Sequence, residues 1–244
     1  MADDPRPSPR AASGEAPRPD YGPVGVIMLN THFPRLPGDV GHPDTFEGHV
    51  LYHRVTDARV AAVVKPGLMS EPLANALLDA ARDLERRGAA IITTSCGFLS
   101  TMQERLRAAV SVPVVSSALV LLPLLRAGCG PHARIGVLTF DTRALTASHF
   151  GGAWGPDVVL EGLELSREFH AVIAEDRPAL DAATAEGEIA LAAQRLRARA
   201  GGTLDAVVLE CTNLAPFLPR IRAEAGAPVF DLAAAVRWMA RDLL

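Results

Sequence analysis

Two cysteines occupy equivalent places in two halves of the chain that repeat each other. Each half has an apolar segment with a glycine, then a cysteine, then a proline between hydrophobic residues. The landmarks are Gly25, Cys96 and Pro113 in the first half and Gly136, Cys211 and Pro228 in the second. The spacing from cysteine to proline is identical in the two halves, and that from glycine to cysteine is nearly so. A duplication of this kind predicts two similar α/β halves related by a pseudo-two-fold axis. Thiols that face each other across one cleft would suit an enzyme that removes a proton from carbon and returns one.

Each cysteine comes where an apolar strand should run into a helix. Cys96 follows the apolar residues 89–93 and precedes a predicted helix that starts near residue 100, so the field at the helix N-terminus should favour the thiolate and lower its pKa. A lone cysteine at a strand end is more often a small core residue, but two in equivalent places favour a functional pair. Their polar neighbours, which could hold a carboxylate, are Ser95, Gly97, Thr212 and Asn213.

Three further side chains are candidates for substrate binding. Asn30 and Asp141 match in the repeat, each at the end of a strand and each followed by threonine. They could contact substrate, or they could cap a helix or make a turn. Arg35 lies in a loop rich in proline and glycine, where it could clamp a carboxylate with two hydrogen bonds or simply be solvated.

Metal and pyridoxal phosphate chemistry fit this sequence poorly. Four histidines fall within residues 30–54, and His49 and His53 have the spacing of a helical zinc pair. The residues between them look like a strand, however, and the glutamate of a zinc-protease motif is missing. Lys65, the single lysine, has no glycine-rich phosphate loop near it. We therefore expect no metal and no cofactor.

Apolar runs alternate with amphipathic segments along the whole chain. This order predicts an α/β fold with parallel sheets covered by helices, and ligands bind at the carboxyl ends of such strands. The predicted strands are 23–29, 60–64, 89–93, 112–115, 135–138, 158–160, 204–209 and 228–230, and the clearest predicted helices are 71–87, 181–200 and 232–244.

The bulk composition limits the compartment and the partners. A net charge of −4 argues against a nucleic-acid surface, and three cysteines in 244 residues are typical of free thiols in a reducing compartment. The longest apolar stretch is too short to cross a membrane. We therefore expect a cytoplasmic protein that binds a small carboxylate and neither nucleic acid nor membrane, with self-association into a homo-oligomer left open.

The motifs TSCG at 94–97 and ECTN at 210–213, with the duplicated Gly-Val starts, make residues 22–244 similar to the aspartate/glutamate racemase superfamily. This group also includes hydantoin racemases, arylmalonate decarboxylases and maleate isomerases. The resemblance implies two Rossmann-like domains with the active site between them and no cofactor or metal. It implies that Cys96 and Cys211 are the acid/base pair acting on opposite faces of the substrate. The residues it places at the carboxylate site are Thr94, Ser95, Gly97, Thr139, Thr212 and Asn213.

Two departures from the superfamily pattern bear on the substrate. Glutamate racemases carry an aspartate-serine pair after the first strand, where this chain has Asn30 and Thr31, and a histidine shortly after the second cysteine, where it has Asn213. These differences argue against glutamate. The presence of both cysteines argues against the one-cysteine decarboxylases.

The sequence therefore predicts a cofactor-independent racemase or epimerase of a small carboxylated carbon acid, such as aspartate or a derivative. One alternative is a maleate-type cis-trans isomerase with Cys96 as nucleophile, and another is a small-acid-binding protein without turnover. The predicted organisation is a disordered tail at 1–21, a first domain of 22–117 with 215–244, and a second domain of 118–214.

Overall fold

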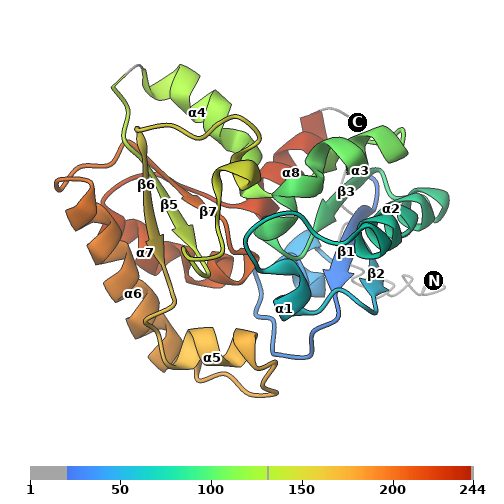
Figure 1. Ribbon diagram of the computed structural model, residues 1–244, viewed down its shortest axis with the longest axis horizontal. Helices are drawn as coiled ribbons and strands as arrows, with labels where there is room; N and C mark the ends of the chain where they lie inside the picture. Colours follow the sequence, from blue (N-terminus) through green and yellow to red (C-terminus); the bar gives the residue numbers. More distant parts are fainter. Residues whose placement is uncertain (1–20, 131, 243–244) are drawn as a thin grey trace, which may run out of the picture.

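Each half of the repeat builds its own parallel sheet. The computed structural model describes residues 21–130 and 132–242, and within them the first sheet has the order β2-β1-β3-β4 and the second the order β6-β5-β7-β8. The second order is the first with every number raised by four, as duplication predicts. The two halves stand side by side in Figure 1, the first on the right and the second on the left. The strands are β1 (Val24–Leu29), β2 (Val50–Val55), β3 (Ile91–Thr94), β4 (Val114–Val115), β5 (Ile135–Thr139), β6 (Val158–Gly162), β7 (Ala206–Leu209) and β8 (Val229–Phe230).

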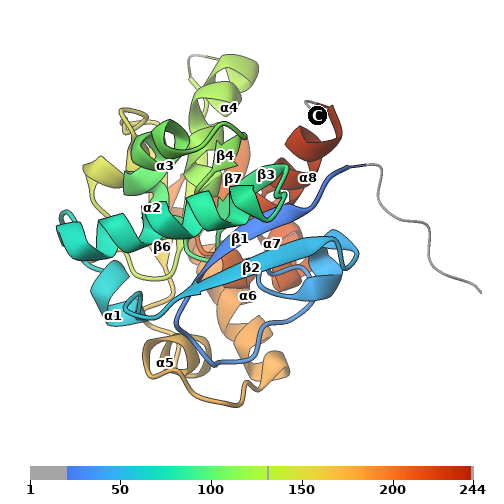
Figure 2. The ribbon, with the colours of Figure 1, turned by 90° about the vertical axis from the view of Figure 1, so that its right-hand side faces the viewer.

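The repeated glycines let a helix approach the first strand of each sheet. A Cβ added to Gly25 would lie 2.8 Å from the Cβ of Ala89 and 3.2 Å from that of Leu84, which belongs to α2 (Glu71–Arg86). A Cβ on Gly136 would lie 2.8 Å from Leu196 of α6 (Ala182–Arg199). Figure 2 shows α2 lying across the first sheet. The same close helix-on-strand packing therefore explains the same residue in both copies.

The predicted strand at 60–64 is wrong, because the edge position of the first sheet belongs to β2. All six residues of β2 pair in register with β1, and residues 60–63 instead form a short helix, α1 (Val60–Val63). Only Val63 is buried in this helix, whereas Val60 and the following Val64 line a cavity. The run is apolar because of that cavity and not because it lies inside a sheet.

The remaining elements cover the sheets and connect the halves. The other α-helices are α3 (Gln103–Ala109), α4 (Leu122–Cys129), α5 (Glu168–Ala174), α7 (Leu218–Ala225) and α8 (Leu232–Asp242). Short 3-10 helices are η1 (Pro43–Phe46), η2 (Gly97–Met102), η3 (Ala118–Leu121), η4 (Ala147–Phe150) and η5 (Thr212–Phe217).

The chain returns to the first half later than the predicted boundary at residue 215. Strand β8 pairs with β7 and completes the second sheet, and α7 packs on α6, so both belong with the second half. Helix α8 crosses back: it contacts η1, β3 and β4 of the first half as well as η5 of the second, and Figure 1 shows it beside the first half. Of the predicted tail, residues 1–20 lie outside the described residues, whereas Tyr21 is buried.

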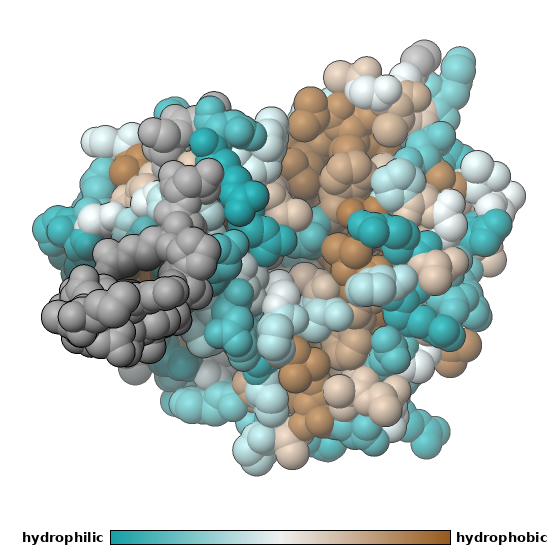
Figure 3. All heavy atoms as spheres, turned by 180° about the vertical axis from the view of Figure 1, so that it is seen from behind, coloured by the Kyte–Doolittle hydropathy of each residue, from teal (hydrophilic) through white to brown (hydrophobic). Residues whose placement is uncertain are grey.

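Hydrophobic side chains also reach the surface between the halves. Figure 3 shows them gathered along a hollow on the face opposite to that of Figure 1. Leu124 of α4 and Trp238 of α8, which are 56% and 55% exposed, line a groove between these two helices. No helix in residues 21–130 and 132–242 combines the length and hydrophobicity of a membrane span.

Candidate active site

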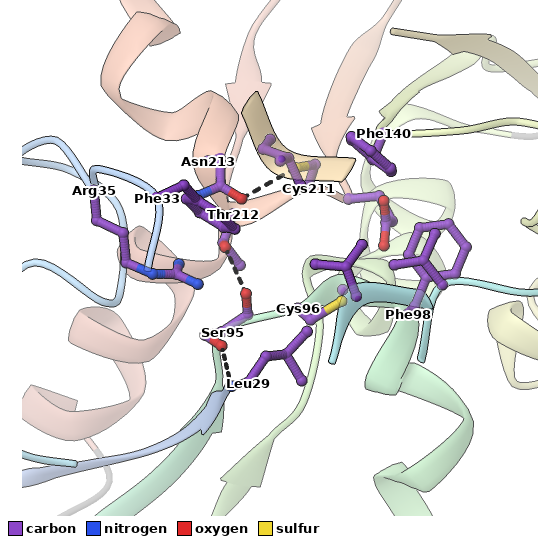
Figure 4. Close-up of a pocket in the computed structure, with 15 residues that line it drawn as sticks. Leu29, Phe33, Arg35, Ser95, Cys96, Phe98, Phe140, Cys211, Thr212 and Asn213 are labelled. Carbon is purple, nitrogen blue, oxygen red and sulfur yellow. Dashed lines mark hydrogen bonds between the residues drawn. The ribbon is translucent and has the colours of Figure 1, made fainter. Parts of the chain in front are cut away.

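A small cavity lies where the carboxyl ends of the strands of both halves meet. Figure 4 shows Arg35 on one side of it and the rings of Phe98 and Phe140 on the other, with Cys96 and Cys211 between them. The lining residues come from both halves: Leu29, Phe33, Arg35, Val60, Val64, Ser95, Cys96, Gly97, Phe98, Phe140, Ile173, Glu210, Cys211, Thr212 and Asn213. The predicted pair of thiols therefore shares one cavity.

Cys96 is the residue that precedes η2, just after β3. Burial, followed by the nearby Glu210 carboxylate, raises the pKa of its thiol to about 12. The backbone amide of Phe98, the Arg35 guanidinium and the amide of Leu99 act in the opposite direction. The expected lowering at the helix N-terminus is therefore present but is outweighed by desolvation, and the predicted net decrease in pKa is wrong for the site without ligand.

Cys211 stands in the equivalent place after β7 but meets different partners. Its Sγ lies 3.7 Å from Oδ1 of Asn213, and Nδ2 of Asn213 donates to Asp39 at 2.7 Å. Because a carboxylate only accepts, it holds the amide nitrogen and leaves the oxygen to accept from the thiol. Burial and then Glu210 raise the pKa of Cys211 well above its usual value. Cys211 is thus held as a proton donor.

Arg35 supplies a fixed positive charge at one end of the cavity. Its side chain is only 9% exposed, and it donates to Asp39 at 2.8 Å and to the Thr31 hydroxyl at 3.2 Å. The Phe33 ring lies 4.8 Å from its guanidinium carbon. Among the described residues that line the cavity, Arg35 alone is permanently cationic, so it is the candidate to hold an anionic group of a ligand in addition to its ion pair with Asp39.

Ser95 and Thr212 join the two halves beside the thiols. The Ser95 hydroxyl accepts from the amide of Leu29 at 3.0 Å, which leaves its own proton for a ligand. The Thr212 hydroxyl donates to the Ser95 carbonyl at 3.0 Å. Both residues line the cavity, as do the predicted Gly97 and Asn213.

Four predicted site residues lie outside the cavity, because their polar groups serve the scaffold. Asn30 donates to the Thr56 carbonyl at 2.8 Å, and the Thr94 hydroxyl donates to the Ser116 carbonyl at 2.7 Å. Asp141 pairs with Arg143 at 2.6 Å. Thr139 is one step removed from the cavity, since its hydroxyl donates to the Glu210 carboxyl at 2.7 Å.

Glu210 and the aromatic wall of the cavity had no predicted role. Glu210 is fully buried, and burial raises its pKa to about 7 against the opposing hydrogen bonds from Thr139 and the Phe140 amide. A usable signal was a charged residue placed directly after the apolar strand 206–209 and before a cysteine. Phe33, Phe98 and Phe140 carry no sequence pattern that separates a cavity wall from a core.

The histidine-rich segment does not reach this cavity. His32 pairs with Asp176 and His53 with Asp83, both at 2.8 Å, and neither histidine lines the site. Within the described residues, no group of three histidine, cysteine, aspartate or glutamate side chains is arranged to hold a metal ion.

Two like-ordered parallel sheets, each bringing one cysteine to a shared cavity, define a two-domain enzyme of the racemase type. A sequence model described as Asp/Glu/Hydantoin racemase matches residues 43–240. The chain belongs to this family.

The proteins that are similar to this chain are named for different activities. The chain is 33% identical over 226 residues to a dimethylsulfoniopropionate lyase of Durusdinium sp. clade D, covering 89% of this chain and 74% of that protein. It is 29% identical to dimethylsulfoniopropionate lyase 7 of Emiliania huxleyi (strain CCMP1516), covering 87% of this chain and 64% of that one. Among solved structures, the allantoin racemase from Klebsiella pneumoniae matches with a TM-score of 0.59 at 16% identity, over 90% of this chain and 87% of that one. This last likeness shows the fold alone.

Proposed function

We propose that this chain is a cofactor-independent lyase that eliminates dimethyl sulfide from dimethylsulfoniopropionate. Its similarity to two lyases of that name supports the substrate, and its membership of the racemase family supports chemistry at a carbon next to a carboxylate. Dimethylsulfoniopropionate is not the amino acid that the sequence suggested, but it is also a small carboxylated carbon acid.

The elimination needs one base and a leaving group on the next carbon. A thiolate takes the proton from Cα, the electron pair of that C–H bond forms the double bond to Cβ, and the Cβ–S bond breaks. Its electrons stay on sulfur, so a neutral sulfide leaves together with acrylate. Preorganised donors must stabilise the charge that develops on the carboxylate during this step.

We assign these tasks to residues of the cavity. Arg35 and the Ser95 hydroxyl bind the carboxylate, and Cys96 is the base: backbone amides and Arg35 oppose the rise of its pKa that burial and Glu210 cause. Cys211, whose thiol is oriented by Asn213, donates a hydrogen bond to the developing enolate. The aromatic wall receives the dimethylsulfonio group, since a cation is attracted to ring faces.

One observation favours dimethylsulfoniopropionate over a dicarboxylic amino acid as the substrate. The cavity-lining residues in the described part of the chain include a single cationic side chain but three phenyl rings, Phe33, Phe98 and Phe140. Glutamate or aspartate would need a second cationic partner for its second carboxylate. A short monocarboxylate with a methylated cationic head matches the lining better.

Racemisation is the second candidate, because both cysteines line the cavity and come from opposite halves. The two reactions differ in what they release and in what they exchange. Incubation with dimethylsulfoniopropionate in D₂O should yield dimethyl sulfide and acrylate. Gas chromatography measures the sulfide and proton NMR the acrylate. Deuterium entering Cα of an amino acid or hydantoin, with no sulfide formed from dimethylsulfoniopropionate, would instead establish the racemase.

A further inference from the structure

Glu210 is a buried acid whose position in the cavity the reaction above does not explain. Its side chain lines the cavity and is fully buried. Oε2 accepts from Thr139 at 2.7 Å and the Phe140 amide also favours the charged carboxyl group, but Oε1 has no hydrogen-bond partner of normal geometry among the described residues. Leaving a buried carboxyl oxygen unpaired is unfavourable unless something else satisfies it.

The unpaired oxygen lies at the contact between the two halves. A Cβ built on Gly97 would clash with Oε1 of Glu210 and with its backbone oxygen. Only glycine fits against this carboxyl group, so Oε1 sits next to the residue that follows Cys96. Both Glu210 and Arg35 act electrostatically on Cys96, with opposite signs. The thiol is therefore subject to a positive and a negative group that act in opposite directions.

The groups around Glu210 leave its charge uncompensated. Arg35 hydrogen-bonds to Asp39 and Thr31, and the Cys96 and Cys211 thiols are neutral at ordinary pH. Phe98 and Phe140 form the wall at this end, with His149 packed edge-on behind Phe98 at 5.2 Å and His170 stacked behind Phe140 at 4.5 Å. A ligand cation would meet ring faces and a carboxylate together at this end.

We propose that Glu210 binds the cationic head of the substrate, so that the cavity recognises a short zwitterion with a carboxylate at Arg35 and a sulfonium or quaternary ammonium group at Glu210. The substrate identity rests on the proposed function, whereas the preference for a cation is tested separately below. This arrangement places Cα of a three-carbon zwitterion between the two poles, where Cys96 lies. A bound cation would also neutralise Glu210 and so remove its repulsion of the Cys96 thiolate. Without a bound cation this repulsion remains.

Binding of a cation at Glu210 should depend on pH. Because burial raises the pKa of Glu210 to about 7, the group is largely protonated below that pH, and a bound cation must displace the proton. Affinity for the cation should therefore weaken as the pH falls below about 7, by up to tenfold per unit in the limit. The other titratable groups that face this end are Cys96, Cys211, His149 and His170. The pKa values of both thiols are raised, and that of His149 is lowered by burial, so all three shifts favour the neutral form.

The test compares two ligands of the same shape that differ in charge. 3-(Trimethylammonio)propionate carries the cation, and 4,4-dimethylpentanoate is its neutral isostere; neither can release a sulfide. Titration calorimetry at about pH 8 should show that the wild type prefers the cation by roughly tenfold or more. Glu210→Gln should weaken the binding of the cationic ligand alone and so bring the two affinities within about threefold of each other. Glu161→Gln, which alters a buried glutamate outside the cavity paired with Arg195 and Arg199, should keep the preference.

The wild type alone also tests the proposal if a variant does not fold. Its preference for the cation should shrink between about pH 8 and pH 6 while the affinity for the isostere, corrected for the ligand's own titration, stays level. An equal affinity for both ligands, a preference that survives Glu210→Gln, or a preference independent of pH would each overturn the role of Glu210. Failure to release dimethyl sulfide would instead overturn the proposed reaction, with the preference still measured by calorimetry.

Discussion

At the scale of single residues, the two cysteines are matched by the repeat but not by their surroundings. Burial and Glu210 raise the pKa of both thiols and a backbone amide opposes this in each, but Arg35 acts only on Cys96. The Cys211 thiol instead faces an amide oxygen held in place by Asp39. The first setting favours a base and the second a proton donor. A duplicated pair has thus become an unequal pair, as a one-directional elimination requires.

This inequality predicts different losses for the two serine variants. Cys96→Ser should lower kcat for dimethyl sulfide release by roughly 10³-fold, because the base is lost. Cys211→Ser should lower it by only about tenfold, because serine still donates a hydrogen bond. Steady-state assays by gas chromatography measure both. Equal and near-complete losses would speak for two-base racemase chemistry.

Removal of the Asp39 side chain should lower the stability of the protein strongly. It is fully buried and accepts hydrogen bonds from Arg35, Asn213 and the Gly41 amide. Asp39→Ala leaves a buried guanidinium without its partner and should lower the free energy of unfolding by about 3–5 kcal/mol, measured by urea denaturation. Asp44→Ala, at a side chain that is 78% exposed in the same segment, is the control and should change it by less than about 0.5 kcal/mol. Similar values for the two variants would contradict this account.

Residues whose spacing repeats could be predicted from the sequence. Residues whose role depends on how deeply they are buried could not. Both cysteines, Ser95 and Thr212 were identified from their place at strand ends, and the structure brings all four to the cavity. Glu210 was passed over, because nothing in a linear sequence shows that a glutamate beside a cysteine is fully buried. Asn30 was included wrongly among residues near the cavity, since a strand-end amide serves equally well in a turn.

At the scale of elements, the α/β fold class and the similarity of the two halves followed from alternation and duplication, while the structure of a short segment did not. Residues 60–64 have the composition of a buried strand, but they follow a β2 that already occupies the sheet edge. Composition reports that a segment meets apolar surroundings. It does not report whether those surroundings are a sheet or a cavity wall.

The matched glycines of the first strands predict a graded cost of adding a methyl group. Gly25→Ala would meet the Cβ atoms of Ala89 and Leu84, which cannot rotate away, whereas Gly136→Ala meets mainly the flexible end of Leu196. We expect the free energy of unfolding to fall by roughly 2–3 kcal/mol for Gly25→Ala and about 1 kcal/mol for Gly136→Ala. Thermal or urea unfolding measures both.

A glycine in open surroundings provides the matched control. Gly187 lies inside α6, and an added Cβ would meet nothing within 4 Å. Gly187→Ala should raise stability by up to about 1 kcal/mol through helix propensity. A loss at Gly187 as large as that at Gly25 would show that the close approach of helix to strand is not the cause.

At the scale of the whole molecule, Asp176 adds a further link between the two halves next to the cavity. Asp176, just after α5 of the second half, accepts from the backbone amides of His32 and Phe33 of the first half at 2.5 and 3.0 Å. Phe33 lines the cavity, as does Ile173 near the end of α5. Asp176 also has a positive φ of 54°, a conformation that asparagine tolerates well. The contact therefore fixes one wall of the site relative to the other.

Asp176→Asn should loosen this contact without disturbing the turn. Because the remaining amide oxygen accepts less strongly than a carboxylate, we expect KM for dimethylsulfoniopropionate to rise several-fold while kcat changes little. Burial alone would raise the pKa of Asp176, but the amide and ring of His32 and the Phe33 amide together lower it. A depressed carboxyl pKa contributes stability that is present above its unfolded value of about 4 and is lost as the pH falls through the folded value. The difference in Tm between wild type and Asp176→Asn should therefore narrow below about pH 4. A difference in Tm that stays constant through the acid range would mean that the carboxylate charge does not hold the halves together.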